Sequence, residues 1–394
     1  MPDPAMPLLF TPLTLRRLML KNRIVISPMC QHAAEDGCAT DWHLVHLGKF
    51  VLGGAGLILT ESTAVSPHGR IGVCDLGLWS DHQVAPLRRV VEFAHAQDVP
   101  IGVQLAHAGR KAASRALWEG GTAFSAEDLH ADLHGPWRRL GPSPIAAGPE
   151  WTVPEALEEA EITEIVEQFA AATRRAVDAG FDAVELHFGH GYLVASFLSP
   201  ISNQRQDGYG GDLAGRMRLA LEIAARVRAE WPQERPLFCR ISAVDGAEGG
   251  WSLEDSVILA RALAERGVDV IDVSSGGLTE ETRRAAVPRG LGFQVPFAET
   301  IRREAGVVTQ AVGMIVDGKQ AEQVLATGAA DLVAIGREAL NDPYWAHRAA
   351  EALGRPLTYQ EWPVRHGAWL AKREQHMGRT IRAQRAALGA SSPG

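Results

Sequence analysis

The sequence predicts an α/β fold in which eight parallel strands close into a (β/α)8 TIM barrel. Three features of the 394-residue chain support this prediction. Short apolar runs recur along it, helix-like stretches separate most of these runs, and unusual polar residues stand where the runs end. Such runs are typical of strands buried on both faces of a parallel sheet, and eight βα units need about 250 residues. We assign the surplus to a capping insertion after the third strand and to a C-terminal arm.

The expected strands follow one another at intervals that leave room for helices. They are Ile24–Ile26, Gly56–Leu59, Ile101–Leu105, Asp182–Leu186, Leu237–Ile241, Val270–Val273, Val307–Thr309 and Leu332–Ile335. Two of the expected helices, Ile162–Ala179 and Leu253–Arg266, stop at a glycine, as helices often do. The other helices are expected at about Gln83–Ala96, Leu213–Glu230, Pro296–Ala305 and Lys319–Thr327.

A doubly wound sheet is the rival fold. It favours a G-x-G-x-x-G turn after the first strand. Here that place is taken by Ser27-Pro28-Met29-Cys30, so the barrel is preferred.

Residues outside the bare barrel fall into three segments. Residues 1–7 are expected to be a disordered leader, and residues 8–353 the barrel. Residues from about 112 to 160 are rich in Gly, Pro and Trp and should form a cap, because so long a connection is usually functional. Residues 354–394 should form an arm that docks on the barrel or on a second subunit and ends in a disordered tail from Gly389.

Composition favours a soluble enzyme with a small-molecule partner. The net charge of −8 gives no basic face for nucleic acid. No apolar run approaches the ~20 residues of a membrane span, and no secretory signal opens the chain. Its four cysteines form no C-x-x-C pair, which leaves no zinc or dithiol motif. We therefore expect a cytoplasmic protein without a metal.

Polar residues gather at the carboxyl ends of the expected strands, where barrel enzymes place their chemistry. Each alone could be structural, but their common position favours an active site. They are Cys30, Glu61, Ser62, Gln104, His107, His187, His190, Arg240, Ser274, Ser275, Gly313, Gly336 and Arg337.

Glycines after the last two strands indicate a phosphate site. Gly313 and Gly336 expose backbone N–H groups, and Arg337 adds a cation. Loops after strands seven and eight commonly bind phosphate in TIM barrels. The alternative for either glycine alone is a tight turn.

One short stretch combines two imidazoles and a phenol: His187, His190 and Tyr192. Two imidazoles can donate hydrogen bonds to one substrate oxygen, and a nearby phenol can protonate a carbon. A surface turn or a pair of metal ligands remains an alternative from this stretch alone. A metal site would need a further ligand such as His107, and Gln104 and Arg240 suit a cation poorly.

Several motifs in order make the chain resemble the Old Yellow Enzyme family of flavin-dependent ene reductases, over roughly Leu8 to Leu353. The presence of Cys30 makes it similar to the thermophilic-like, YqjM-type subclass. The motifs are Ser27-Pro28-Met29-Cys30, Gln104-Leu105-Ala106-His107-Ala108-Gly109-Arg110-Lys111, His187-x-x-His190-Gly191-Tyr192-Leu193, Phe197-Leu198-Ser199-Pro200, Asn203-x-Arg205-x-Asp207-x-Tyr209-Gly210-Gly211 and Gly336-Arg337.

The resemblance implies FMN over the barrel mouth, with NADPH or NADH as hydride donor. Arg240 would lie near N1 and the C2 oxygen and stabilise the anionic reduced flavin. Gln104 would bond the pyrimidine edge, and Cys30 would tune the potential. The remaining residues assigned to FMN are Ser27, Pro28, Met29 and Ser62 near the ring, and Gly313, Gly336 and Arg337 at the phosphate.

The resemblance also implies the reaction, which is reduction of the activated C=C bond of α,β-unsaturated carbonyl compounds by ping-pong hydride transfer through flavin N5. His187 and His190 would bind the carbonyl oxygen, and Tyr192 would protonate the α-carbon. The alternatives are reduction of other electrophiles, such as quinones or nitro compounds, and, less favoured, a metal-dependent barrel hydrolase.

One substrate contact departs from the subclass pattern. The subclass has a tyrosine two residues after the cysteine, and this chain has His32, whose charge would change near neutral pH. The subclass also inserts an arginine or tryptophan of a neighbour's C-terminal arm into the site. This implies a homodimer or homotetramer, with Trp362, Arg365 and Trp369 as the candidate residues.

Overall fold

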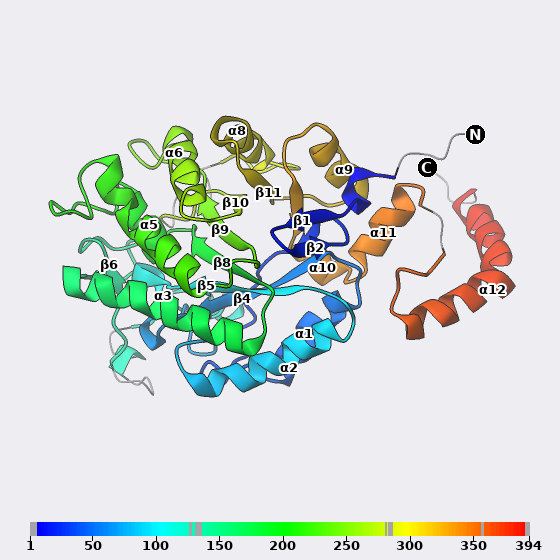
Figure 1. The fold of residues 1–394 in the computed structure, drawn as a ribbon, viewed down its shortest axis with the longest axis horizontal. Helices are drawn as coiled ribbons and strands as arrows, with labels where there is room; N and C mark the ends of the chain where they lie inside the picture. The colour runs from blue at the N-terminus through cyan, green and yellow to red at the C-terminus, as the bar shows by residue number, and fades with distance from the viewer. Residues whose placement is uncertain are drawn as a thin grey trace.

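The fold is a closed barrel of eight parallel strands surrounded by helices (Figure 1). The computed structural model describes residues 6–125, 128–130, 136–279, 282, 287–355 and 358–390. Going around the barrel, the strands lie in the order β10-β11-β12-β3-β4-β5-β8-β9. Every strand of the ring has two neighbours, so the sheet has no edge. The predicted TIM barrel is confirmed, and the doubly wound alternative is wrong.

All eight predicted strands are present. Most of them continue beyond the predicted carboxyl end, because the polar residues of the barrel mouth stay in the strand ladder; Ser62, for example, pairs with Gln104. Their bounds are β3 Ile24–Ile26, β4 Leu57–Ala64, β5 Ile101–Ala106, β8 Ala183–Phe188, β9 Leu237–Ser242, β10 Val270–Ser274, β11 Val308–Ala311 and β12 Leu332–Ile335.

The six predicted helices are also present. They are α2 Val84–His95, α3 Glu159–Ala179, α5 Leu213–Glu230, α6 Leu253–Ala264, α8 Val295–Ala305 and α9 Gly318–Ala326. Helix α3 ends at Gly180, whose φ of 91° is the left-handed conformation that glycine adopts without strain. Helix α6 ends at Ala264, before the predicted Arg266, and a turn carries the chain on to Gly267.

Several elements were not predicted, because each is short or lacks a clear apolar period. Within the described ranges they are the hairpin β1 Leu13–Leu15 and β2 Leu18–Leu20, the pair β6 Leu140–Gly141 and β7 Glu155–Ala156, six short 3-10 helices, and the helices α1 Asp41–Val51, α4 Leu193–Leu198, α10 Arg337–Asn341, α11 Trp345–Ala352 and α12 Val364–Ala390.

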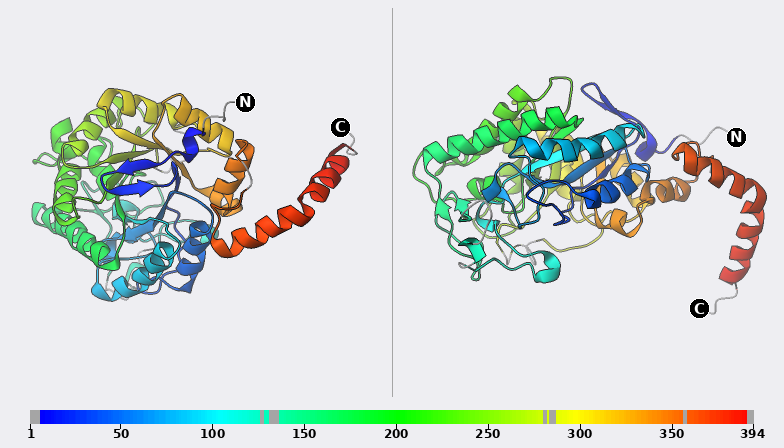
Figure 2. Two further views of the ribbon diagram at one scale, coloured as in Figure 1. Left: turned by 45° about the vertical axis from the view of Figure 1, so that its right-hand side comes forward. Right: turned by 90° about the horizontal axis from the view of Figure 1, so that it is seen from below.

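The β1–β2 hairpin closes one end of the barrel. Its Leu15 and Leu20 belong to an apolar cluster with Val25, Leu57 and Phe238 of the barrel strands. In the left view of Figure 2 the hairpin lies across the end of the ring. The chemistry is therefore left to the opposite end, where the strands finish.

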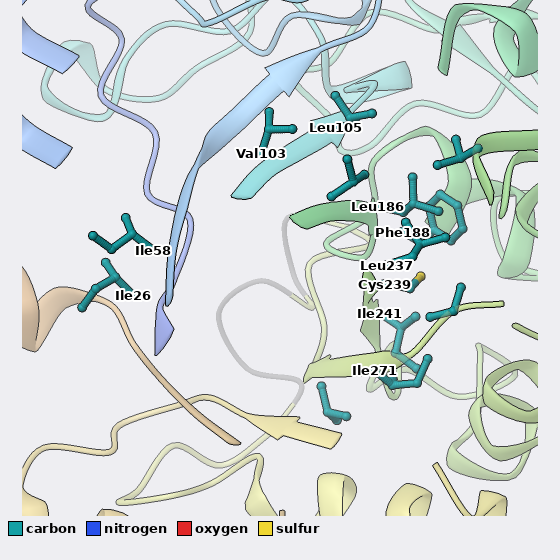
Figure 3. Close-up of a cluster of buried hydrophobic side chains, with 14 of the residues drawn as sticks. Ile26, Ile58, Val103, Leu105, Leu186, Phe188, Leu237, Cys239, Ile241 and Ile271 are labelled. Carbon is teal, nitrogen blue, oxygen red and sulfur yellow. The ribbon is translucent and has the colours of Figure 1, made fainter. Parts of the chain in front are cut away.

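Alternation along the strands separates the apolar core from the polar interior. Figure 3 shows Val103, Leu105, Leu186 and Phe188 pointing away from the barrel axis, as do Leu237, Cys239 and Ile241. Because successive side chains of a strand point to opposite faces, the residues between them point into the barrel. The inward set includes Gln104, Glu185, His187 and Arg240.

The connection from β5 to α3 and the C-terminal arm lie outside the ring. Within the connection, residues 126–127 and 131–135 are outside the described part, and Arg139 donates to the carbonyls of Ala112, Ala113 and Phe124. Helix α12 runs away from the barrel (Figures 1 and 2). Residues 1–5 of the expected leader and 391–394 of the expected tail lie outside the described residues, and Gly389 and Ala390 end α12. None of the helices in the described ranges is long and apolar enough to cross a membrane.

A side-chain cap at the start of α5 provides a test of local stability. The Oδ1 atom of Asp212 accepts the backbone N–H of Gly215 at 2.8 Å. We expect Asp212→Ala to lower the free energy of unfolding by about 1 kcal/mol, because the N–H loses its acceptor. Asp212→Asn keeps an acceptor and should cost less. Urea denaturation of both variants measures the difference, and equal losses would contradict a capping role.

Candidate active site

A cavity of about 640 Å³ lies at the carboxyl ends of the barrel strands. Its lining comes from the loops after β3, β5, β8, β10, β11 and β12 and from the strand ends of β9, β10 and β12. Nine of the residues that the sequence assigned to the cofactor, the substrate or catalysis line it: Ser27, Pro28, Met29, His190, Tyr192, Arg240, Gly313, Gly336 and Arg337. Ser274 and Ser275, singled out at a strand end without a role, line it as well.

The other five residues given such a role do not line this cavity. Ser62 and Gln104 are opposite one another on β4 and β5, and the Cys30 thiol lies against the backbone of Ser62. His187 is opposite Arg240 on β9 and touches the rings of the cavity wall. His32 lies beside Asp75, near Cys30 in the chain.

The two histidines of the β8 end bring one nitrogen each to a common point. His187 Nε2 lies 3.3 Å from His190 Nδ1, and the two ring planes are 80° apart. His187 Nδ1 accepts the backbone N–H of Gly189 at 3.4 Å, so the ring proton belongs on Nε2. Burial lowers the pKa of both imidazoles well below the usual range, and Arg240 adds to this effect. Both rings are therefore neutral near pH 7.

Hydrogen bonds fix the position of His190. Its backbone N–H donates to Ser242 Oγ at 2.9 Å, and its Nε2 lies 2.6 Å from Ser274 Oγ. The residue has a φ of 58°, and Gly191 follows because a Cβ there would lie 2.3 Å from the carbonyl oxygen of Gly277. The loop can hold His190 in place only with glycine at position 191.

Tyr192 lies beside the histidine pair. Its ring centroid is 5.0 Å from that of His187, and Lys111 Nζ is 5.2 Å from the centroid of the phenol ring. Lys111 also donates to the carbonyl oxygens of His190 and Gly277, at 2.8 and 2.9 Å. The ammonium therefore ties the loop of His190 to the loop after β10. Sequence analysis placed Lys111 in a motif but gave it no role.

Arg240 supplies positive charge on the floor of the cavity. Its guanidinium is buried, and Nη1 donates to Ser27 Oγ at 2.9 Å. Nearby, Gln104 Nε2 donates to Glu185 Oε1 at 2.8 Å. A cation and an amide at this depth suit an electron-rich heterocycle above them.

The far end of the cavity suits a phosphate. Gly313, Gly336 and Arg337 are all among the lining residues, and backbone N–H groups with a guanidinium are the donors that bind phosphate. A Cβ at Gly336 would meet only Met29 Sδ and Ser27 Cβ, at 3.8 and 3.9 Å, so glycine keeps the space between β12 and the β3 loop open. The donor set of the whole cavity, from Gly313 to Arg240, fits FMN.

Sequence analysis missed some residues of the wall. Arg289, Phe293 and Gln294 come from the connection between β10 and α8, where no motif marks them. The Gln294 amide reaches the hydroxyl groups of Ser274 and Ser275, at 3.1 and 2.9 Å. This loop reaches the contacts of His190 only in the folded chain, so its residues could not be identified from the sequence.

His107, considered as a third metal ligand, is engaged in its own turn. Its Nδ1 accepts the backbone N–H of Gly109 at 3.0 Å, and burial lowers its pKa to about 3. Among the described residues, no group of three or more His, Cys, Asp or Glu side chains could hold a metal ion.

His32 and Cys30 are close in the chain, and the pKa of each is raised, for a different reason. His32 Nδ1 lies 2.7 Å from Asp75 Oδ1, and this hydrogen bond raises the pKa of the imidazole. Burial, with Asp75 and Glu61 adding to it, raises the pKa of the Cys30 thiol well above the usual range. Cys30 is therefore an uncharged thiol near pH 7.

The His32–Asp75 pair predicts a pH-dependent contribution to stability. A raised histidine pKa in the folded state stabilises the fold fully below the unfolded pKa of about 6.5, and the effect is lost as pH rises through the folded pKa. We expect His32→Gln to cost about 1–2 kcal/mol at pH 5.5 and clearly less at pH 8.5. Denaturation at both pH values measures this. The control is His82→Gln, because the His82 contact with Asp36 is longer, at 3.6 Å, and exposed, so it should contribute little at either pH. The same pH trend of equal size in both variants would contradict the assignment.

Known proteins resemble this chain over most of its length. A model of the NADH:flavin oxidoreductase / NADH oxidase family matches residues 8–355. Proteins named NADPH dehydrogenase from a Geobacillus species and from Listeria innocua are each 43% identical to it, over 89% of this chain and 96% of the relative. The solved structure of morphinone reductase has a TM-score of 0.74 at 28% identity and covers 89% of this chain and 90% of its own.

Proposed function

This chain belongs to the NADH:flavin oxidoreductase / NADH oxidase family, and we propose that it reduces the activated C=C bond of α,β-unsaturated carbonyl compounds. More broadly, it is an FMN-dependent NADPH oxidoreductase of the Old Yellow Enzyme family, as its resemblance predicted. The observation that carries the finer proposal is the meeting of His187 Nε2 and His190 Nδ1 beside the phenol of Tyr192.

We propose that the cavity binds FMN through the residues assigned from the sequence. When bound, FMN supplies hydride transfer, from NADPH or NADH to the β-carbon of the substrate. Arg240 would contribute positive charge beneath the ring system, and Ser27, Pro28 and Met29 would form its border. Ser62, Gln104 and Cys30 would support that border from behind, and Gly313, Gly336 and Arg337 would hold the phosphate.

The histidine pair would bind the carbonyl oxygen of the substrate. Since the two nitrogens are 3.3 Å apart, an oxygen could replace their mutual contact and accept from both. His190 can donate from Nδ1 when Ser274 donates its hydroxyl proton to Nε2, 2.6 Å away. Two neutral donors would stabilise negative charge on the oxygen without transferring a proton to it, which favours protonation at carbon.

Tyr192 would then supply the proton to the α-carbon. A phenol with a pKa of roughly 10 in water is protonated near pH 7 and acidic enough to quench an enolate. The Lys111 ammonium, 5.2 Å from the ring centroid, would favour the phenolate that remains. His32 would contact the substrate from the opposite side, where the subclass has tyrosine.

The proposal is tested by an absorbance spectrum followed by two anaerobic additions. The purified protein should show bound flavin, NADPH should bleach it, and an enone such as 2-cyclohexenone should restore the colour and yield the saturated ketone. Restoration by quinones or nitro compounds but not by enones would favour the alternative substrate class. A protein that binds no flavin would contradict the proposal.

We also propose that the protein forms a homodimer or homotetramer with the C-terminal arm at the interface, and that it works in the cytoplasm. On α12, Val364 and Trp369 are 86% and 72% exposed. Trp362 stacks on His347 of its own chain at 3.9 Å, so Arg365 and Trp369 are the better candidates to reach a neighbour. Light scattering should give fewer subunits per particle for a chain that ends at Pro363 than for the full chain; an equal number of subunits would contradict the proposal.

A further inference from the structure

Two carboxyl groups and one guanidinium are buried together beneath the cavity. Glu185 on β8 and Asp272 on β10 are 0% exposed, and Arg240 on β9 is 8% exposed. Arg240 and Asp272 are paired in register. Two ionised carboxylates at this depth would leave a net negative charge without water, which is strongly unfavourable.

Hydrogen bonds distinguish the oxygens of the two acids. Glu185 Oε1 accepts from Gln104 Nε2 at 2.8 Å, so it behaves as a carbonyl oxygen. Glu185 Oε2 and both Asp272 oxygens receive no well-aligned hydrogen bond from the described residues. The two carboxyl groups lie within hydrogen-bonding reach of one another. A proton on Glu185 Oε2, directed at Asp272, would satisfy both groups.

The surrounding charges select the same arrangement. Burial raises the pKa of Glu185 well above its usual range, and the nearby Asp272 adds to this. Burial also raises the pKa of Asp272, but Arg240, with Nε 3.5 Å from Asp272 Oδ2, and hydrogen bonding with Glu185 and Gln310 oppose the shift. Arg240 opposes the raised pKa of Glu185 too, but there the charge of Asp272 has the larger effect. The neighbouring Cys239 and His187 are uncharged, since burial raises the thiol pKa and lowers the imidazole pKa.

We infer that Glu185 and Asp272 share one proton, which Glu185 carries and donates to Asp272, so that a single carboxylate faces Arg240 and sets the reduction potential of bound FMN. Both acids are positioning residues, because they act through the guanidinium. The effect on FMN rests on the proposed function, which places Arg240 beneath the flavin. The location of the proton does not.

The two amide variants should behave differently although each removes one acid. Asp272→Asn leaves the Arg240 charge unopposed, which favours the more negative, reduced cofactor. We expect at least a tenfold higher ratio of reduced to oxidised FMN at a fixed potential, about 30 mV for two electrons. Glu185→Gln is the matched control, because its amide N–H replaces the acid O–H and its oxygen still accepts from Gln104. In this variant the ratio of reduced to oxidised FMN should stay within about threefold of the wild-type ratio, which corresponds to a shift of about 14 mV by the same conversion.

Equilibration of the holoprotein with a redox dye measures these potentials. A shift in Glu185→Gln alone would place the proton on Asp272, and equal shifts in both variants would mean two carboxylates; either result overturns the inference. Arg240→Gln tests the flavin placement: if it lowers the potential while Asp272→Asn changes nothing, the inference fails. If Arg240→Gln changes nothing, the proposed placement fails instead.

Infrared spectroscopy locates the proton independently of the flavin position. The carbonyl stretch of a buried, protonated carboxylic acid should disappear in Glu185→Gln and persist in Asp272→Asn. Its persistence in Glu185→Gln would overturn the inference. Because Glu185→Gln preserves shape and hydrogen bonds, this measurement remains decisive if Asp272→Asn does not fold.

Discussion

Replacing Tyr192 with phenylalanine should slow reoxidation of the reduced enzyme by an enone by about 10²–10⁴-fold, because the α-carbon loses its proton donor. Reduction of the enzyme by NADPH should stay normal, because no proton from Tyr192 enters that half-reaction. The substitution removes one hydroxyl and keeps the ring, whose contact with His187, 5.0 Å between centroids, depends on shape. The substitution should therefore slow the half-reaction with the enone and leave the half-reaction with NADPH unchanged.

Stopped-flow absorbance follows each half-reaction separately. Tyr209→Phe is the matched control: its hydroxyl donates to Glu222 at 2.9 Å and lies outside the cavity lining. An unchanged rate with the enone in Tyr192→Phe would remove Tyr192 from the proton-donor role. Slowing of both half-reactions would indicate that flavin binding was damaged instead.

The strands of the barrel could be predicted because burial on both faces makes their runs mostly apolar. The apolar run ends before the strand does, since residues of the barrel mouth such as Ser62 remain in the strand ladder. The β1–β2 hairpin was not predicted because each of its strands has three residues of which only one is buried, whereas all three residues of β3 are buried. Helix α12 was not predicted because its sequence is largely polar and shows no clear apolar stripe.

The sequence could predict where the candidate site lies, but not which of its residues line the cavity and which lie behind the wall. A residue near the carboxyl end of a strand lies at the barrel mouth, so Gln104, His187 and Arg240 were expected there. The sequence cannot tell a wall residue from one just behind it, and Gln104 and His187 are of the second kind. Glu185 and Asp272 stood within predicted strands, and an acid in a doubly buried strand is the signal that could have identified their pair.

Replacing both His187 and His190 with alanine should lower the rate of enone reduction by about 10²–10³-fold or more, because each imidazole is a donor to the developing oxyanion. Affinity for a phenol such as 4-hydroxybenzaldehyde should fall as well, since its oxygen would use the same donors. Burial lowers the pKa of both imidazoles, so they remain neutral across pH 6–8. The mutational loss should therefore be nearly independent of pH in that range.

Flavin absorbance changes on titration with the phenol measure this affinity, and single-turnover kinetics give the rate. His190→Asn is the conservative control: its amide N–H can still donate, so it should recover part of the loss seen in His190→Ala. A structural role alone predicts no such rescue, because asparagine cannot reproduce the 2.6 Å contact of the imidazole Nε2 with Ser274 Oγ while also donating into the cavity. If His190→Asn and His190→Ala lose the same fraction of the enone reduction rate, and phenol affinity is unchanged, His187 and His190 do not bind the carbonyl oxygen.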